Sequence, residues 1–283
     1  MQFLGIFLKF LLLCLIFSNI AHANCFNDLR TPIDPNEDPF FIQLNKAIIL
    51  VNELVDDDTL HLALLNLDES ILENENTIPV SAVTYNRSNG IVAQVPIGCR
   101  EIIFGNTEFE EQVEQAKFES QALYGNEENM LAILLLHELG HVEAGHHGEF
   151  VSIDKKAAVV NLDENQVKER ERLADQFIVR YLKPQAQLAE KGEADFDALF
   201  LITFLAQLSF EVSGQASIDY FGERVLNGRR IFWDHSYTHE NLEYRLLKIN
   251  HAINPTDVSK QLLSEYEKSR DNSKTGGRPV FSK

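Results

Sequence analysis

The chain is short of basic side chains, of cysteine and of long hydrophobic runs. Its 25 lysines and arginines are set against 43 aspartates and glutamates, so the formal net charge is −18. This balance argues against a nucleic acid or an anionic membrane surface as the main partner, because neither attracts an acidic protein. The 283 residues, of which 45% are hydrophobic, suffice for one sizeable core.

The first long apolar run lies at the N-terminus. Residues 1–23 carry one charge, Lys9, followed by the apolar run Phe10–Phe17 and then by Ala21-His22-Ala23. This order, with a small-x-small end, is typical of a signal peptide with a cleavage site after residue 23. We therefore expect an exported protein, either periplasmic or secreted, and favour cleavage over an uncleaved anchor helix.

No membrane span is expected after the signal peptide. The apolar stretch Ala194–Val212 carries Asp195 and Asp197 and is shorter than the roughly 20 apolar residues that a span requires. Export would place the chain in an oxidising compartment, where Cys25 and Cys99 could form one disulfide. Two free thiols are the alternative.

The most specific pattern in the chain is His137-Glu138-Leu139-Gly140-His141. On a helix, residues four positions apart share a face, so the two imidazoles could hold one metal ion. The stretch Met130–Leu136 before them is apolar on every side, which predicts a buried helix. Buried histidines and a glutamate are costly unless they are paired or bound to metal. The pattern therefore indicates a Zn²⁺ site with Glu138 as general base, although a structural polar cluster is an alternative.

A hydrolytic zinc site needs a third protein ligand, for which the chain offers two main candidates. His147 lies ten residues after His137, as in the elongated metzincin motif, but no methionine follows Met130 to supply that group's Met-turn. Glu171 and Asp175 lie four residues apart in a second helical stretch. One carboxylate could bind the metal while the other accepts a hydrogen bond from a ligand histidine. Asp154 is an isolated third candidate.

Three blocks of the sequence resemble the HtpX-like and CAAX-prenyl-protease-type zinc metallopeptidases of the gluzincin group. The blocks are His137-Glu138-Leu139-Gly140-His141-Val142 with His146, Arg170-Glu171-x-x-Ala174-Asp175, and Thr238-His239 with Arg245. The resemblance covers roughly residues 127–250 and implies that His137, His141 and Glu171 bind one zinc ion. It further implies that Glu138 is the general base, that Asp175 supports a ligand, and that His239 and Arg245 lie near the metal.

The chain also departs from that family. Glu240 stands where the family usually has proline, and the transmembrane helices of its membrane-embedded members have no counterpart here. A soluble exported member is therefore the closer comparison. Either His235 or Tyr237 could replace His239 as the donor that stabilises a developing oxyanion, and this His-rich stretch could also be a surface loop.

The patterning predicts an α+β fold, mostly helical, in which a zinc-binding helix and a second ligand-bearing helix accompany a small antiparallel sheet, as in zincins. We expect a metallopeptidase domain over residues 24–268 and a disordered tail over 269–283. A capping box at Thr107 opens one predicted helix, and Pro184 ends another. The expected helices are Phe40–Leu54, Thr107–Leu123, Glu164–Lys183, Ala194–Val212 and Glu240–Ile253, and the expected strands are Thr77–Tyr85, Gly90–Ile97 and Glu101–Phe104.

The hypothesis that best fits these patterns is a secreted or periplasmic zinc endopeptidase that acts on protein or peptide substrates. An edge strand beside the zinc helix could hold an extended substrate by main-chain hydrogen bonds, or the strands could merely cover the core. Two alternatives stay open. One is an exported binding or assembly protein with a structural or degenerate zinc site, and the other is a metzincin-like peptidase that uses His147.

Overall fold

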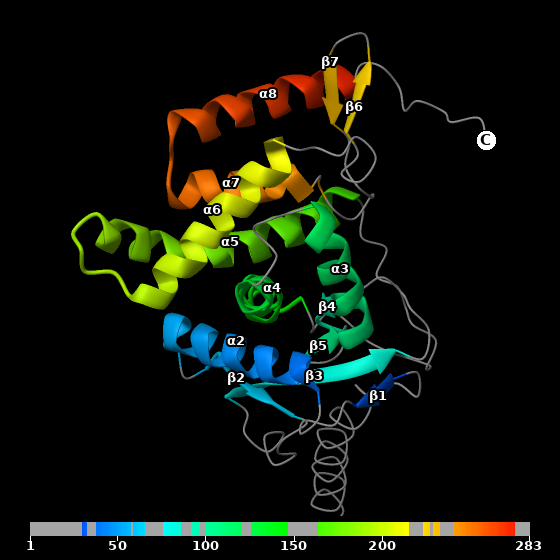
Figure 1. Cartoon of the computed structure of the whole chain (residues 1–283), viewed down its shortest axis with the longest axis vertical. Coiled ribbons are helices and arrows are strands. Elements are labelled where there is room, and N and C mark those ends of the chain that lie inside the picture. The colour runs from blue at the N-terminus through cyan, green and yellow to red at the C-terminus, as the bar shows by residue number, and fades with distance from the viewer. Residues whose placement is uncertain are drawn as a thin grey trace, which may run out of the picture.

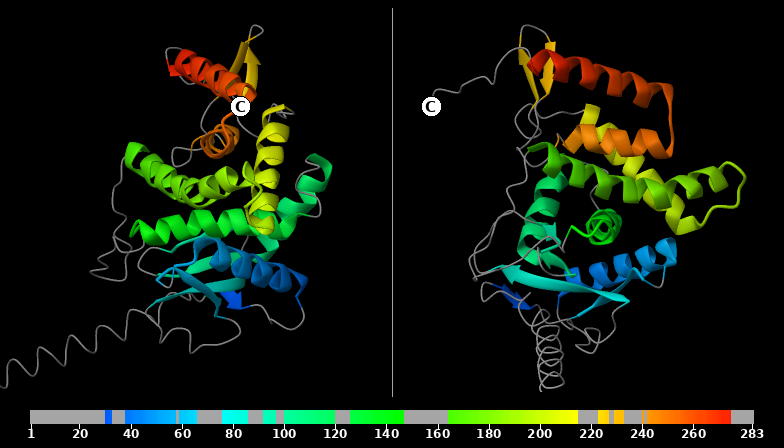
Figure 2. Two further views of the ribbon diagram at one scale, coloured as in Figure 1. Left: turned by 90° about the vertical axis from the view of Figure 1, so that its left-hand side faces the viewer. Right: turned by 180° about the vertical axis from the view of Figure 1, so that it is seen from behind.

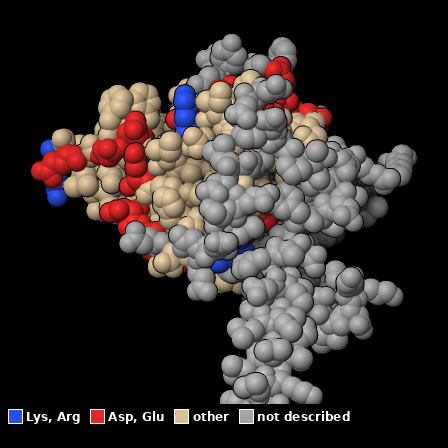
Figure 3. Space-filling model, turned by 90° about the horizontal axis from the view of Figure 1, so that it is seen from below, with Lys and Arg blue, Asp and Glu red and all other residues tan. Residues whose placement is uncertain are grey.

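The structure is a computed structural model, and it describes residues 30–32, 38–57, 59–65, 76–85, 92–96, 100–119, 126–146, 164–214, 223–226, 229–232, 240 and 242–274. The expected signal peptide, both Cys25 and Cys99, and residues 275–283 of the expected tail lie outside these ranges. Within them, no helix has the length and apolar character needed to cross a membrane. On the face that Figure 3 shows, the described residues expose more acidic side chains than basic ones, in keeping with the net charge.

Helices make up most of the described structure, and a small sheet accompanies them, so the expected α+β class is confirmed. The helices are α2 (Pro39–Val55), α3 (Asn106–Glu119), α4 (Glu127–Glu143), α5 (Glu164–Ala189), α6 (Phe196–Gly214), α7 (Leu242–Ile253) and α8 (Asp257–Lys274). The strands are β1 (Arg30–Pro32), β2 (His61–Leu64), β3 (Thr77–Tyr85), β4 (Ala93–Gln94), β5 (Ile102–Gly105), β6 (Glu223–Leu226) and β7 (Arg229–Phe232).

The main sheet is mixed, so the expectation of an antiparallel sheet was wrong. Its strand order is β1-β3-β5-β4, and β2 also pairs with β3. Strand β3 runs parallel to β2 and β5, whereas β1 and β4 run antiparallel to their neighbours. Parallel neighbours require a long connection between them, and residues 65–76 separate β2 from β3. A separate hairpin joins β6 to β7.

Helix α4 occupies the centre of the fold. Figure 1 shows it end-on, with α2 and the sheet on one side and α5 and α6 on the other, and Figure 2 shows the same layers from the side. Its apolar side chains on more than one face, including Leu131, Leu135 and Leu136, have no exposed surface. The prediction of a buried helix is thus confirmed. The burial is possible because leucines surround the helix axis rather than forming one stripe.

Several predicted ends are corrected. Helix α5 continues past Pro184 to Ala189, because Leu182 is fully buried and Ala186 packs against the core beyond the proline. Proline removes one hydrogen bond, but this tertiary packing holds the helix together. Helix α8 extends to Lys274, so residues 269–274 are helical rather than disordered. Helix α3 begins at Asn106, whose amide donates to Asp38, so Thr107 lies inside the helix instead of capping it.

Candidate metal centre

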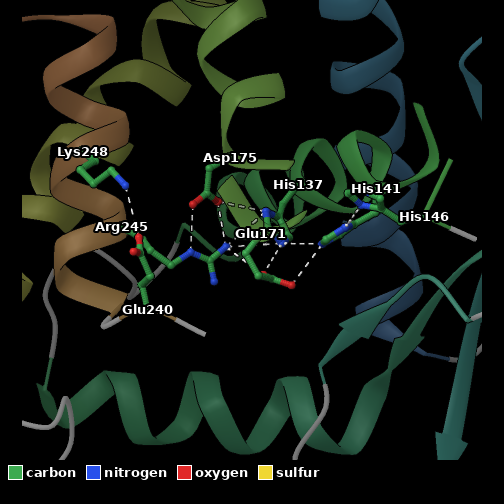
Figure 4. A network of polar contacts seen from close by, with 8 residues as sticks. All are labelled: His137, His141, His146, Glu171, Asp175, Glu240, Arg245 and Lys248. Carbon is green, nitrogen blue, oxygen red and sulfur yellow. Dashed lines mark hydrogen bonds and ion pairs between the residues drawn. The ribbon is translucent and has the colours of Figure 1, made fainter. Parts of the chain in front are cut away.

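Helices α4 and α5 pack closely at Gly140. A Cβ atom at this position would come within 2.8 Å of the Ala174 Cα and of the Phe177 Cβ. Only glycine therefore allows the two helices to come this near, and the contact lies in the middle of the His-Glu-x-x-His pattern. The crossing places His137 and His141 of α4 opposite Glu171 and Asp175 of α5, as Figure 4 shows.

Three donor groups converge at this crossing. The Nε2 atoms of His137 and His141 are 3.2 Å apart. The Glu171 carboxylate lies 3.3 Å from His137 Nε2 through Oε2 and 3.5 Å from His141 Nε2 through Oε1. Donors bound at 2.0–2.1 Å to one tetrahedral ion would be about 3.3 Å apart. The group His137, His141 and Glu171 could therefore hold a metal ion.

Asp175 and Arg245 hold the far side of His137. Asp175 Oδ1 lies 3.1 Å from His137 Nδ1. Arg245, from α7, donates to both Asp175 oxygens, through Nη2 at 2.8 Å and Nε at 2.9 Å. The same Nη2 lies 3.3 Å from Glu171 Oε2. This bidentate contact fixes the Asp175 carboxylate, which in turn orients the ring of His137 so that Nε2 faces His141 and Glu171.

The charges of this cluster shift its pKa values strongly in the metal-free protein. Burial opposes the charged form of His137, but the hydrogen bonds that its ring donates to Asp175 and Glu171 outweigh this effect and raise the pKa to about 9. Burial, together with the charge on His137, lowers the pKa of His141 to about 3. Burial would raise the pKa of Glu171, yet its contacts with His137 and Arg245 lower it to about 2. The metal-free site thus holds a proton on His137 and keeps His141 neutral.

Glu138 lies beside the donors but is not one of them. Its side chain is buried, with 7% of the residue exposed. Burial raises the pKa of Glu138 to about 7, against the opposing effect of His137 and of the backbone N–H of Val95. Val95 follows β4 directly, so the last strand in the sheet order reaches this carboxylate. A carboxylate with a pKa near neutrality can both take up and return a proton at physiological pH.

The structure brings together most of the predicted site. His137, Glu138, His141, Glu171, Asp175 and Arg245 all lie in one cluster. His147, the other candidate for the third ligand, lies outside the described residues, as do Asp154, His235, Tyr237 and His239. Their predicted roles stay predictions.

Two further polar residues extend the cluster without a role predicted for either of them. Glu240 is 2% exposed and accepts hydrogen bonds from Arg172 and Lys248 at 3.0 and 3.2 Å. It thereby ties the start of α7, which carries Arg245, to α5. His146 lies 2.8 Å from His141 through their Nδ1 atoms. Gly145 is the sequence feature that could have indicated this contact, because a glycine at the end of α4 permits a sharp turn that brings the next residue back toward the helix.

Searches of protein-family models, curated proteins and solved structures each returned no match to the chain. The resemblance to HtpX-like metallopeptidases therefore rests on the three sequence blocks, and a function for the protein has to be inferred from the geometry of the site.

Proposed function

We propose that the protein is an exported zinc-dependent endopeptidase with a zincin-like arrangement of its two ligand-bearing helices. The observation that carries this proposal is the convergence of His137, His141 and Glu171. The two Nε2 atoms are 3.2 Å apart, and the two carboxylate oxygens of Glu171 lie 3.3 Å from one Nε2 and 3.5 Å from the other, close to the spacing of donors around one tetrahedral ion. Two imidazoles and one carboxylate form a ligand set that hydrolytic zinc sites use, since it leaves a fourth position for water. Zinc held there would acidify bound water and polarise a peptide carbonyl.

Glu138 has the position and the proton affinity of a general base. It is buried beside His137, and its pKa is raised to about 7. Its carboxylate would accept the proton of the attacking water and then deliver that proton to the leaving amine nitrogen. Asp175 and Arg245 contribute by holding His137 in one orientation throughout.

The substrate is proposed to be an extended polypeptide that lies along β4. This strand is last in the sheet order and contacts α4, and the N–H of the following residue, Val95, approaches Glu138. A strand in this position can align a peptide by main-chain hydrogen bonds with little demand on its sequence. The −18 net charge favours neutral or basic substrates over acidic ones.

Substitution of Glu138 by glutamine tests this function. We expect Glu138→Gln to keep the zinc content of the wild type and to hydrolyse an unfolded protein substrate at least about 100-fold more slowly, since general-base catalysis contributes about 10² to 10⁴. Glu143→Gln is a matched control, because Glu143 is an exposed carboxylate on the same helix.

Three results would contradict the proposal. Wild-type protein that binds no zinc would rule out the proposed metal centre. If the zinc-loaded protein hydrolyses no polypeptide and a chelator changes nothing, the protein is better explained as a binding or assembly protein with a structural zinc site. Hydrolysis by Glu138→Gln at the wild-type rate would show that another group accepts the proton.

A further inference from the structure

Each histidine of the metal centre presents Nε2 to Glu171 and turns its other ring nitrogen away. His137 Nδ1 lies 3.1 Å from the Asp175 carboxylate. His141 Nδ1 lies 2.8 Å from the Nδ1 atom of His146. The nearest partner on the far side of each ring, as Figure 4 shows, is a carboxylate for His137 and an imidazole for His141. A carboxylate can only accept a hydrogen bond, whereas an imidazole nitrogen either donates or accepts.

The contact between His141 and His146 restricts the tautomers of both rings. When Nε2 of His141 offers its lone pair to a metal, Nδ1 must carry the proton and donate it. Nδ1 of His146 must then accept, which places the proton of His146 on its own Nε2. The acceptor aligns the His141 ring and increases the basicity of its metal-facing nitrogen.

The end of α4 explains why His146 reaches back to His141. Gly145 has a φ of +71°, a left-handed conformation that L side chains rarely adopt. The N–H of Gly145 donates to the carbonyl of Val142 at 3.0 Å, and the N–H of His146 donates to the carbonyl of His141 at 3.0 Å. These two bonds form a Schellman motif, in which the residue after the glycine folds over the last helical turn.

The usual side-chain contact of this motif has been replaced by a polar one. In Schellman motifs the residue after the glycine frequently makes an apolar contact with the residue five positions earlier. Here those two positions are His146 and His141, whose ring centroids are 5.1 Å apart. The helix cap therefore serves a second purpose, because the backbone turn delivers a hydrogen-bond acceptor to a residue of the metal centre.

We propose that His146 is a positioning residue that orients His141 and fixes its tautomer for zinc, and that the Gly145 turn exists to place it. This inference rests on the proposed zinc site but not on peptidase activity. His146 would contribute to zinc affinity through His141 without touching the metal.

The test is a pair of substitutions that differ in whether residue 146 can accept a hydrogen bond. In His146→Asn, the side-chain oxygen is attached to the same carbon as Nδ1 and can accept from His141. His146→Leu has similar bulk but no acceptor. We expect His146→Leu to raise the dissociation constant for zinc, measured by chelator competition, about 10- to 100-fold, and His146→Asn to stay within about threefold of wild type.

A spectroscopic measurement separates positioning from a merely structural role. In zinc-loaded protein, ¹⁵N NMR of labelled histidines should show the proton of His141 on Nδ1 in the wild type and in His146→Asn. In His146→Leu this proton should exchange faster with water, because its acceptor is missing.

Substitution of Gly145 tests the role of the turn independently, and Gly192 provides a matched control. Gly192 ends α5 with a φ of +73°, and Gly192 and Glu193 donate to Ala189 and Leu188 in the same Schellman pattern. Neither Gly145 nor Gly192 has an atom within 4 Å of an added Cβ, so alanine at either position strains the backbone without a clash. Both variants should lose similar stability, but only Gly145→Ala should weaken zinc binding.

The outcomes separate the proposals. Wild-type zinc affinity in His146→Leu, or an equal loss in His146→Asn, would overturn the positioning role. A loss above about 1,000-fold in both variants would make His146 a ligand instead. Equal effects of Gly145→Ala and Gly192→Ala on zinc affinity would overturn the role of the turn. Failure of the wild type to bind zinc would overturn both proposals, whereas zinc binding without peptidase activity would overturn the proposed function alone.

Discussion

Zinc uptake by the metal-free protein should release about two protons at pH 6. One comes from His137, whose pKa is raised to about 9 and which must give up a proton before Nε2 can bind a metal. His141 contributes none, because burial holds its pKa at about 3. Glu171 contributes none either, because its pKa is lowered to about 2.

The second proton comes from Glu138. Its pKa of about 7 leaves it mostly protonated at pH 6 while the site lacks metal. Exchange of a proton on His137 for a divalent ion adds one positive charge to the site. A unit charge about 5 Å away at an effective dielectric constant of about 20 is worth about 3 kcal/mol, or about two pKa units. A decrease of this size in the pKa of Glu138 is enough to ionise its carboxyl group at pH 6.

The assay is isothermal titration calorimetry with zinc in buffers of different ionisation enthalpy, which yields the number of protons released. At pH 6 a zinc-bound water, with a pKa near about 7, adds little to the count. Glu138→Gln should release about one proton, because only His137 then titrates. Zinc affinity should rise with pH from 6 toward 9 as His137 loses its proton. A wild-type release near zero would contradict a protonated His137, and one equal to that of Glu138→Gln would contradict a protonated Glu138.

Two further predictions concern stability. Gly140→Ala should lower the free energy of unfolding by about 1–3 kcal/mol, because its Cβ would overlap the backbone of Ala174; an unchanged urea midpoint would contradict the close crossing of α4 and α5. Arg245→Met should destabilise the metal-free protein by about 3–5 kcal/mol, since it leaves the buried carboxylates of Asp175 and Glu171 to share the single positive charge of His137. Urea denaturation in the presence of a chelator measures this loss, and equal stability of Arg245→Met and wild type would show that the ion pair contributes nothing net.

Local patterns sufficed to predict the helices that carry the site. The i, i+4 spacing of His137 and His141 places them on one face of α4, and the apolar run before them predicts its burial. Glu171 and Asp175 repeat that spacing on α5. Helix geometry alone fixes such relations, because they depend only on the residues within one or two turns.

Strand direction could not be predicted from local patterns. β3 and β5, both expected as strands of an antiparallel sheet, run parallel, although their apolar residues fit either direction. Direction depends on the path of the chain between the strands, which local side-chain patterns do not specify. The same limit explains the error at Pro184, where packing of Leu182 and Ala186 on the core outweighs a local signal to stop the helix.

Residue types and helical spacing were enough to identify the main chemical groups of the site and to place them in pairs on helix faces. That the two faces meet depends on how the helices pack in three dimensions. Gly140 allows α4 and α5 to approach until Glu171 lies 3.3 Å from His137, and Arg245 reaches them from a helix 70 residues beyond Asp175. Separations between donor atoms follow from the packing of whole helices, and therefore no pattern within one helix contains them.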